Sequence, residues 1–136
     1  MTNNAKSQFY FDDYRIENIN FEMNNDFKNG DVDVDFDADF NLNIYEEENK
    51  GLLNIEVKFW ENAAKDSYPF ELSISIIGVF SSDPSMDKEQ FETMCKYNGA
   101  AILFPYIRSA ITDITKVANL PSLILPTINI RRLIDQ

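Results

Sequence analysis

The fold of this chain is decided by the stretch DVDVDFDADFNLNI, residues 31–44, in which aspartate or asparagine alternates with an apolar side chain. Successive side chains of a β-strand point to opposite faces, so this period of two predicts a strand with one buried face and one face in water. The stretch is longer than an ordinary strand, and we expect it to bend partway. A half-buried strand requires partner strands and a layer that covers its apolar face.

Three further segments supply the partner strands: residues 10–23, 53–59 and 70–76. In the first of them, the apolar side chains change parity between Ile16 and Ile19, which predicts a β-bulge at Glu17-Asn18. Turn-forming residues separate these segments, and four consecutive strands with short connections predict an antiparallel meander.

The covering layer is expected from helices in the last third of the chain. Asp83-Pro84 has the form of a helix start, with Asp83 as the N-cap, and Asn98-Gly99 has the form of a helix stop. A main helix is predicted from about residue 100 to residue 118, and one of its arcs is apolar and should cover the sheet. That arc consists of Leu103, Phe104, Tyr106, Ile107, Ala110, Ile111, Ile114, Val117 and Ala118.

The opposite arc of this helix carries mostly short hydroxyl side chains. It holds Ser109, Thr112 and Thr115 together with Arg108 and Lys116. Small side chains let a second helix approach closely, so we predict an oligomer interface at Ser109, Thr112 and Lys116, with a solvated face as the alternative. The predicted fold class is therefore α+β: a four-stranded antiparallel meander sheet with a long helix packed on one face, in a single domain over residues 1–136.

The composition excludes several classes of function. The 136 residues carry a net charge of −11, no histidine and one cysteine, Cys95, for which we expect a buried structural role. Without histidine the chain has no Ser-His-Asp or Cys-His pair, and one cysteine cannot build an ordinary zinc site. It also lacks a G-x-x-x-x-G-K-S/T phosphate loop. We therefore expect a protein that is not an enzyme and that needs neither metal nor cofactor.

Charge and hydropathy also narrow the partners and the location. A strongly acidic chain repels nucleic acid and attracts basic proteins over long range. No apolar run approaches the ~20 residues that a membrane helix needs, and the N-terminus has no apolar signal region. These features predict a cytoplasmic protein that does not insert into membranes.

The aspartates at positions 31, 33, 35, 37 and 39 also suggest calcium, because the first three match an EF-hand loop. However, Phe36 stands where that loop needs glycine, and Leu42 stands where it needs a bidentate glutamate. A solvated strand face is the favoured interpretation, followed by a docking surface for a basic protein and then by a metal site.

Trp60 is a candidate binding residue because it breaks the parity of its strand. It directly follows Phe59, so one of the two rings should face away from the core of the sheet. Exposed aromatic side chains mark binding surfaces, although a single exposed ring is also common on ordinary surfaces.

Three segments match the pattern of a known protein family. They are Ile19-Asn20-Phe21-Glu22, Gly78-Val79-Phe80-Ser81, and a C-terminal set made of Ile102-Leu103-Phe104-Pro105-Tyr106, Arg108, Ile111-Thr112, Pro121, Leu123, Leu125 and Asn129. On these residues the chain resembles the SecB family of export chaperones over nearly its whole length. The resemblance implies a homotetramer, built as a dimer of dimers with the long helices at its centre. It also implies an ATP-independent holdase that keeps exported proteins unfolded and delivers them to the SecA motor.

The resemblance also implies two sets of site residues. Unfolded client polypeptides would bind in a groove beside Phe36, Trp60, Tyr106, Leu120, Leu123 and Leu125. SecA would dock on the carboxylate of Glu22, which keeps the acidic family position, and on that of Glu71, which lies near Ser73 on the same face.

Some positions depart from the family pattern. Asn18 and Ser73 stand where typical members are acidic, and the closing helix is short. Delivery to SecA is therefore less certain than the holding of clients. Some SecB-like proteins are dedicated chaperones of antitoxins in toxin–antitoxin systems, and this is the first alternative function. The second alternative is a small-ligand binding protein that uses a pocket between sheet and helix.

Overall fold

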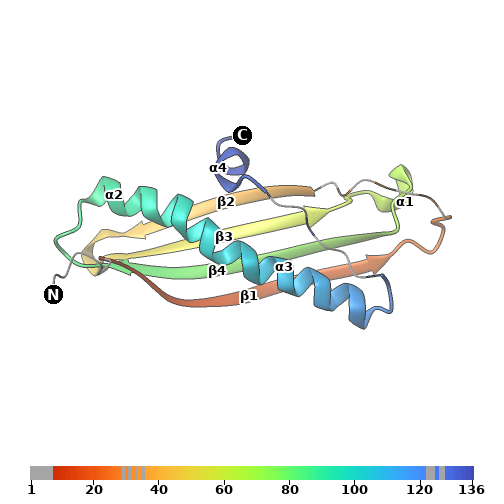
Figure 1. Ribbon diagram of the computed structural model, residues 1–136, viewed down its shortest axis with the longest axis horizontal. Coiled ribbons are helices and arrows are strands. Elements are labelled where there is room, and N and C mark those ends of the chain that lie inside the picture. The colour runs from red at the N-terminus through yellow and green to blue at the C-terminus, as the bar shows by residue number, and fades with distance from the viewer. Residues whose placement is uncertain are drawn as a thin grey trace.

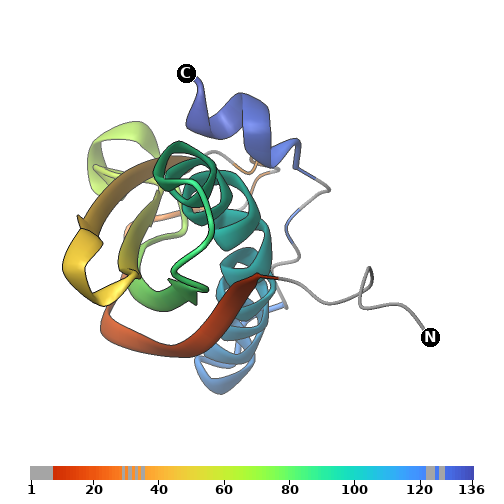
Figure 2. The same ribbon diagram turned by 90° about the vertical axis from the view of Figure 1, so that its left-hand side faces the viewer.

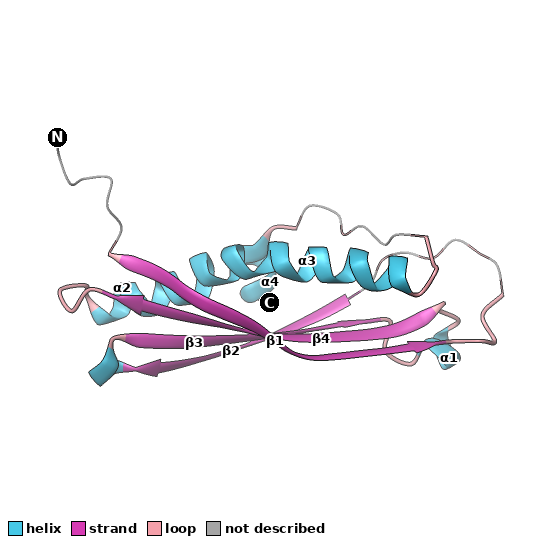
Figure 3. Ribbon diagram, turned by 90° about the horizontal axis from the view of Figure 1, so that it is seen from below, coloured by secondary structure: helices cyan, strands magenta, loops and turns pink. Residues whose placement is uncertain are grey.

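Four antiparallel strands form one sheet in the computed structural model, which describes residues 8–28, 30, 32, 34, 36–121, 125 and 128–136. The strands are β1 (Phe9–Met23), β2 (Phe36–Tyr45), β3 (Lys50–Phe59) and β4 (Phe70–Ser82). A long helix crosses one face of the sheet, and the other face is open over most of its area (Figures 1 and 3). This arrangement confirms the α+β class with a long helix on one face.

The order of the strands differs from a meander. It is β1-β4-β3-β2, so β2, β3 and β4 follow one another as antiparallel neighbours while β1 lies next to β4. The expected position of β1 beside β2 is therefore wrong, and the order is that of a Greek key. The physical reason is the connection over residues 24–35, which is long enough to pass the end of the sheet. The start of this connection is held beside the neighbouring strand β4, because the backbone N–H of Asn24 donates to the Pro69 carbonyl at 3.0 Å.

Strand β1 contains two irregularities in its pairing with β4. Ile16 pairs with Ile76 and Asn18 pairs with Ser75, which leaves Glu17 as an extra residue and confirms the predicted bulge. A second shift lies between Phe11 and Asp13. The core-facing side chains change parity across it, from Phe9 and Phe11 to Ile16. However, Tyr10 and Tyr14 share the parity of Ile16 and hide this change in the sequence pattern. Bulges increase the twist of a strand, and β1 curves around the helix when the sheet is viewed end-on (Figure 2).

Strand β2 is shorter than the alternating stretch that predicts it. It begins at Phe36, and Val32 and Val34 lie outside it, whereas residues 31, 33 and 35 are outside the described part of the chain. A 3-10 turn, η2 (Glu46–Glu48), joins β2 to β3, and a short helix, α1 (Ala63–Asp66), lies between β3 and β4.

The helical layer begins four residues later than expected. Asp87 is the N-cap of α2 (Lys88–Thr93), because its carboxylate accepts the backbone N–H of Gln90 at 3.2 Å. Asp83 has a different role: its carboxylate accepts the hydroxyl of Tyr10 at 2.8 Å, which holds the loop to β1. Asp83 and Asp87 are both possible N-caps in the sequence. Because Asp83 binds Tyr10, Asp87 caps the helix.

The predicted helix stop at Asn98-Gly99 is wrong. Helix α2 continues through a π-helical turn, η3 (Met94–Asn98), into α3 (Gly99–Val117) without a break. Gly99 is buried in ordinary helical geometry, with φ at −59°, and a Cβ at this position would lie 3.1 Å from the ring of Phe80. The glycine therefore lets the helix approach the sheet closely.

Among the described residues, no helix is long and apolar enough to cross a membrane. A short C-terminal helix, α4 (Ile130–Ile134), follows α3 after a connecting segment.

The core lies between this helix and the covered face of the sheet. The side chains of Leu103, Phe104, Ile107 and Ile111 are buried there, as their periodicity predicts. The inward side chains of the central strands complete the core; they include Phe59, Phe80, Leu53, Ile55, Leu72, Ile74 and Ile76.

The last turn of α3 departs from the predicted arcs. Val117, assigned to the apolar arc, is 88% exposed, and Thr115, assigned to the polar arc, is fully buried. Helix α3 crosses the strands diagonally, so its C-terminal turn lies beyond the edge formed by β1 (Figure 1). The hydroxyl of Thr115 is satisfied within the helix, 3.1 Å from the carbonyl oxygen of Ile111.

Cys95 is buried in the π-helical turn, as expected of a structural thiol. Its burial raises the pKa of the thiol to about 12. The side chain is therefore a neutral packing group at physiological pH, and a reactive thiolate is absent at this position.

The close contact between helix and sheet leads to a testable expectation at Gly78. A Cβ added there would lie 2.8 Å from a methyl carbon of Leu103 and 2.8 Å from the ring of Phe80, and both side chains are fully buried. Gly78→Ala should therefore lower the free energy of unfolding by roughly 1–3 kcal/mol through overpacking. Urea unfolding measures this change. Ser73→Ala is the matched control, because Ser73 lies on the same strand but points to the open face of the sheet. Its free energy of unfolding should stay within about 0.5 kcal/mol of the parent value. Equal midpoints for both variants would show that the helix does not press on β4 at this point.

Candidate functional site

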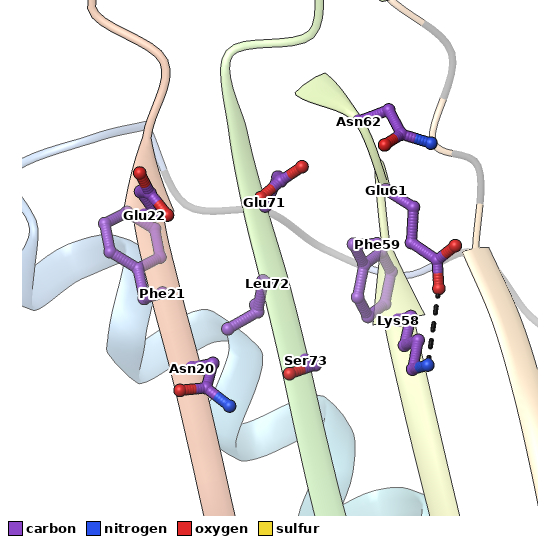
Figure 4. Close-up of a pocket in the computed structure, with 10 residues that line it drawn as sticks. All are labelled: Asn20, Phe21, Glu22, Lys58, Phe59, Glu61, Asn62, Glu71, Leu72 and Ser73. Carbon is purple, nitrogen blue, oxygen red and sulfur yellow. Dashed lines mark ion pairs between the residues drawn. The ribbon is translucent and has the colours of Figure 1, made fainter. Parts of the chain in front are cut away.

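The open face of the sheet carries more acidic than basic side chains. Glu22 on β1 pairs directly with Glu71 on β4, so the two predicted docking carboxylates are cross-strand neighbours. They line a hollow of about 370 Å³ together with side chains from three strands (Figure 4). The structure therefore brings the two docking residues together, and Ser73 lies two positions along β4 in the same hollow.

Lys58 is the cation at the rim of this hollow. Its ammonium group lies 3.5 Å from a carboxylate oxygen of Glu56 and 3.5 Å from one of Glu61. The negative charge of Glu56, followed by that of Glu61, raises the pKa of Lys58. Lys58 is thus paired with two other acids, and among the described residues neither Glu22 nor Glu71 takes part in an ion pair. The Glu71 carboxylate also accepts the backbone N–H of Ala63 at 3.1 Å, which fixes its position.

The predicted binding aromatics do not meet in one groove. Phe36 is half-buried at the start of β2, with its ring centroid 5.2 Å from that of Phe59. Tyr106 stacks on Tyr14 of β1, with a centroid distance of 3.9 Å. Strands β1 and β2 are the two outer strands of the sheet, about 14 Å apart at a spacing of ~4.8 Å per strand. Phe36 and Tyr106 therefore belong to separate patches on opposite edges.

Trp60 is buried and therefore adds no exposed ring to either patch. The expectation that Phe59 or Trp60 faces away from the core is wrong, because both side chains are buried, at 1% and 5% exposure. Trp60 has a left-handed backbone with φ at 53°, which ends β3 and turns the ring back toward the sheet. The indole stacks on Tyr68 at 5.6 Å and meets the edge of Phe70 at 4.8 Å. Sequence parity misses this because it assumes that the strand continues through Trp60.

Between α3 and α4 the structure describes residues 118–121, 125, 128 and 129. Asn119 has a left-handed backbone with φ at 62°, and Leu120 beyond it is half-buried. Leu125 is buried, and its carbonyl accepts a hydrogen bond from Arg108 at 3.0 Å. Leu123, the remaining predicted binding residue, is outside the described part of the chain.

The predicted oligomer residues are placed along the outer side of α3. Ser109 and Lys116 are exposed, and Thr112 is half-buried. A hollow of about 460 Å³ with an almost entirely apolar lining lies beside them, formed by Phe21, Asp113, Ile114, Val117 and Ala118. Sequence reasoning did not place Val117 or Phe21 at this surface, because the diagonal path of the helix is set by packing and not by local pattern.

Strand β1 also presents apolar side chains on its outer edge. Tyr10, Tyr14, Ile19 and Met23 are between 37% and 45% exposed. No strand lies beyond β1 in the described sheet, so its outer backbone groups are free to pair with another strand. A long edge strand with exposed apolar side chains is typical of an interaction surface.

The aspartate ladder keeps its alternation where it is described. Asp37 and Asp39 are exposed on β2, and they pair with Lys58 and Glu56 on β3. In the part of the chain that the structure covers, no three histidine, cysteine, aspartate or glutamate side chains come together in a way that could hold a metal ion. The positions 31, 33 and 35 are outside that part.

Comparisons with known proteins identify one protein family and one sequence relative. Residues 2–136 match the family model described as SecB, preprotein translocase subunit SecB. An uncharacterised protein of Methanocaldococcus jannaschii is 33% identical over 132 residues, which span 92% of this chain and 81% of that protein.

Two solved structures share the fold at low sequence identity. A SecB-like chaperone of Mycobacterium tuberculosis, in complex with a ChAD peptide from the HigA1 antitoxin, has a TM-score of 0.72 at 16% identity, covering 90% of this chain and 91% of that one. A protein of unknown function from Streptococcus agalactiae has a TM-score of 0.54 at 17% identity, covering 90% of this chain and all of that one.

Proposed function

This chain belongs to the SecB family, and from that premise we propose that it is an ATP-independent holdase chaperone. It binds extended apolar segments of unfolded proteins in the cytoplasm, performs no catalysis and requires no metal or cofactor. Binding the unfolded state lowers its free energy and so competes with folding and aggregation. The whole chain, residues 1–136, acts as one SecB-like unit.

The observation that carries this proposal is the pair of apolar patches at opposite edges of the sheet. One patch contains Phe36, and the other contains Tyr106 stacked on Tyr14. Each patch alone is too small for tight binding. The registers place Tyr14 level with Leu42, six residues along β2 from Phe36, so the patches lie roughly 24 Å apart, a distance that an extended chain of roughly 3.3 Å per residue spans with about seven residues. Weak patches that hold one chain together gain affinity through effective concentration. Leu120 adds a half-buried apolar side chain, whereas Trp60 and Leu125 are buried and contribute to packing rather than to direct client contact.

Alanine variants of the two patches test the proposal. Phe36→Ala and Tyr106→Ala should each weaken binding of a denatured client about five- to tenfold, because each removes an aromatic contact worth about 1 kcal/mol or more. The assay is the suppression of light scattering by a denatured client, together with its dissociation constant. Tyr45→Ala is the matched control, because Tyr45 is an exposed ring on the open face of β2, away from both patches. A parent protein that binds no denatured client refutes the holdase function, whereas unchanged variants refute only the site.

A dedicated antitoxin chaperone is the second candidate. It is supported by the antitoxin-derived peptide in the complex of the mycobacterial SecB-like chaperone. The two functions differ in client range, so affinity purification from the native host separates them: one stoichiometric client supports the dedicated role, and many substoichiometric clients support the general role.

We also propose that the open face docks a basic surface of SecA through Glu22 and Glu71. The support is their direct cross-strand pairing and the net charge of −11 on the chain. The departures at Asn18 and Ser73 leave fewer carboxylates on this face than in typical members, so the affinity should be modest.

Charge removal tests this docking. The double variant Glu22→Gln, Glu71→Gln should weaken SecA binding by about tenfold at low salt, and the loss should shrink as salt rises because screening weakens the parent too. Isothermal titration at two salt concentrations measures the effect. Glu47→Gln, Glu48→Gln carries the same charge change in the exposed turn at the far end of the sheet. An equal loss in both double variants would reduce the effect to net charge alone.

We propose, finally, that the chain assembles as a homotetramer, a dimer of dimers. The free outer edge of β1 and the outer side of α3 with Ser109, Thr112 and Lys116 supply two separate surfaces for this assembly. The 88% exposure of Val117 beside an apolar hollow supports a partner at the end of α3.

A buried charge should disrupt that contact. Val117→Asp is expected to lower the mass of the assembly to that of a dimer or monomer in light scattering coupled to size exclusion, because an unpaired carboxylate in an apolar contact costs several kcal/mol. Asn41→Asp adds the same charge on the exposed side of β2 and should leave the mass unchanged. A parent protein that is monomeric at all concentrations contradicts the tetramer.

A further inference from the structure

The short helix α4 and the π-helical turn border a third hollow, away from the surfaces described above. Helix α4 lies beside the first half of the long helix, on the same side of the sheet (Figures 1 and 2). The hollow between them has a volume of about 460 Å³, within the range of roughly 300–1,000 Å³ that is usual for ligand pockets. Its lining consists of Tyr97, Asn98, Ala101, Ile102, Ile130 and Arg131.

Two contacts of Tyr97 give this hollow its shape. The Tyr97 hydroxyl donates a hydrogen bond to the carboxylate of Asp135 at 2.6 Å, which ties the end of α4 to the π-helical turn. The guanidinium of Arg131 lies 4.0 Å from the centroid of the Tyr97 ring. Stacking on the ring uses the flat face of the guanidinium and leaves its N–H groups, which point outward in the plane, able to donate.

Arg131 has no ion-pair partner among the described residues. The ion pairs among the described residues join Arg15 to Glu17, Lys58 to Glu56 and Glu61, and Lys88 to Glu46. Arg131 takes part in none of them, although the chain as a whole carries a net charge of −11. The carboxylate of Asp135, which also contacts Tyr97, accepts the tyrosine hydroxyl and forms no ion pair with Arg131. The guanidinium, held against the ring, is therefore available to a carboxylate from outside.

The floor of the hollow is apolar. Ala101 and Ile102 come from α3 and Ile130 comes from α4, and Ile102 and Ile130 also pack against the core. Asn98 adds an amide at the edge. An apolar floor beside one oriented cation matches a peptide segment with an apolar side chain next to an aspartate or glutamate.

We propose that this hollow binds a pair of neighbouring residues in a client polypeptide, one apolar and one acidic. The apolar side chain would pack on Ala101, Ile102 and Ile130, and the carboxylate would bind Arg131. This inference rests on the proposed holdase function and adds a rule of selection to it. Most of the molecular surface repels acidic segments, because the chain is strongly acidic. This hollow instead attracts an acidic residue, and so it would fix how an extended client is aligned along the protein surface.

Two fluorescent peptides test the inference. They are identical except that one contains a Leu-Glu step and the other a Leu-Gln step, and fluorescence anisotropy gives the dissociation constants. The parent protein should bind the Leu-Glu peptide roughly three- to fivefold more tightly, the factor expected for a partly exposed ion pair. Arg131→Gln should abolish this preference and leave binding of the Leu-Gln peptide nearly unchanged.

Arg132→Gln is the matched control, because it makes the same change of charge at the next position of α4, and Arg132 is not part of the lining. It should keep the preference for the Leu-Glu peptide. Equal loss of preference in both arginine variants, or a parent that binds the two peptides equally, overturns the inference while leaving the holdase function intact. A parent that binds neither these peptides nor a denatured client overturns both. Far-ultraviolet circular dichroism verifies the fold of each variant, and Arg131→Lys, which keeps the charge, should retain part of the preference.

Discussion

The close packing of one continuous helical run against one face of the sheet is the constraint on which the rest of the structure depends. Gly99 and Gly78 carry no side chain where the helix and the sheet approach each other. The ring of Phe80 and the methyl groups of Leu103 fill the space beside these glycines. Each large apolar side chain buried in this layer contributes roughly 1.5–3 kcal/mol. The π-helical turn absorbs an extra residue within this run, so the helix stays continuous while it crosses the strands.

This packing also decides where the free surfaces lie. A diagonal helix covers one face of the sheet and extends past its edge, so it leaves the acidic face, the outer edge of β1 and its own last turn exposed (Figure 1). These are the surfaces from which the proposed functions follow: apolar patches for extended chains, carboxylates for a basic partner, and an edge and a helix side for assembly. A single-layer sheet with one covering helix is therefore well suited to binding, because it cannot bury all of its apolar surface within one subunit.

Much of the architecture is predictable from local pattern. The alternation in residues 36–44 and 53–59, the bulge at Glu17, and the helical arc with Leu103 and Ile107 all agree with the structure. These features depend on which face of an element is buried, and the period of apolar residues records that directly. The cross-strand pairing of Glu22 with Glu71 also agrees with the predicted docking pair, although their docking role stays a prediction.

By itself, the sequence determined the four strands with their buried faces, the main helix with its core-facing arc, and an acidic composition without metal-binding or nucleophilic chemistry based on histidine. Only the tertiary structure decided that β1 lies beside β4, that Gly99 lies inside a helix, that Trp60 turns inward, and that Arg131 rests on Tyr97. The physical reason is the range of the interactions. Periodicity reports the environment of neighbouring residues along one element, whereas strand order, close approach and contacts such as that between α4 and the π-helical turn join residues that are distant in the chain, and the packing of the whole core selects among them.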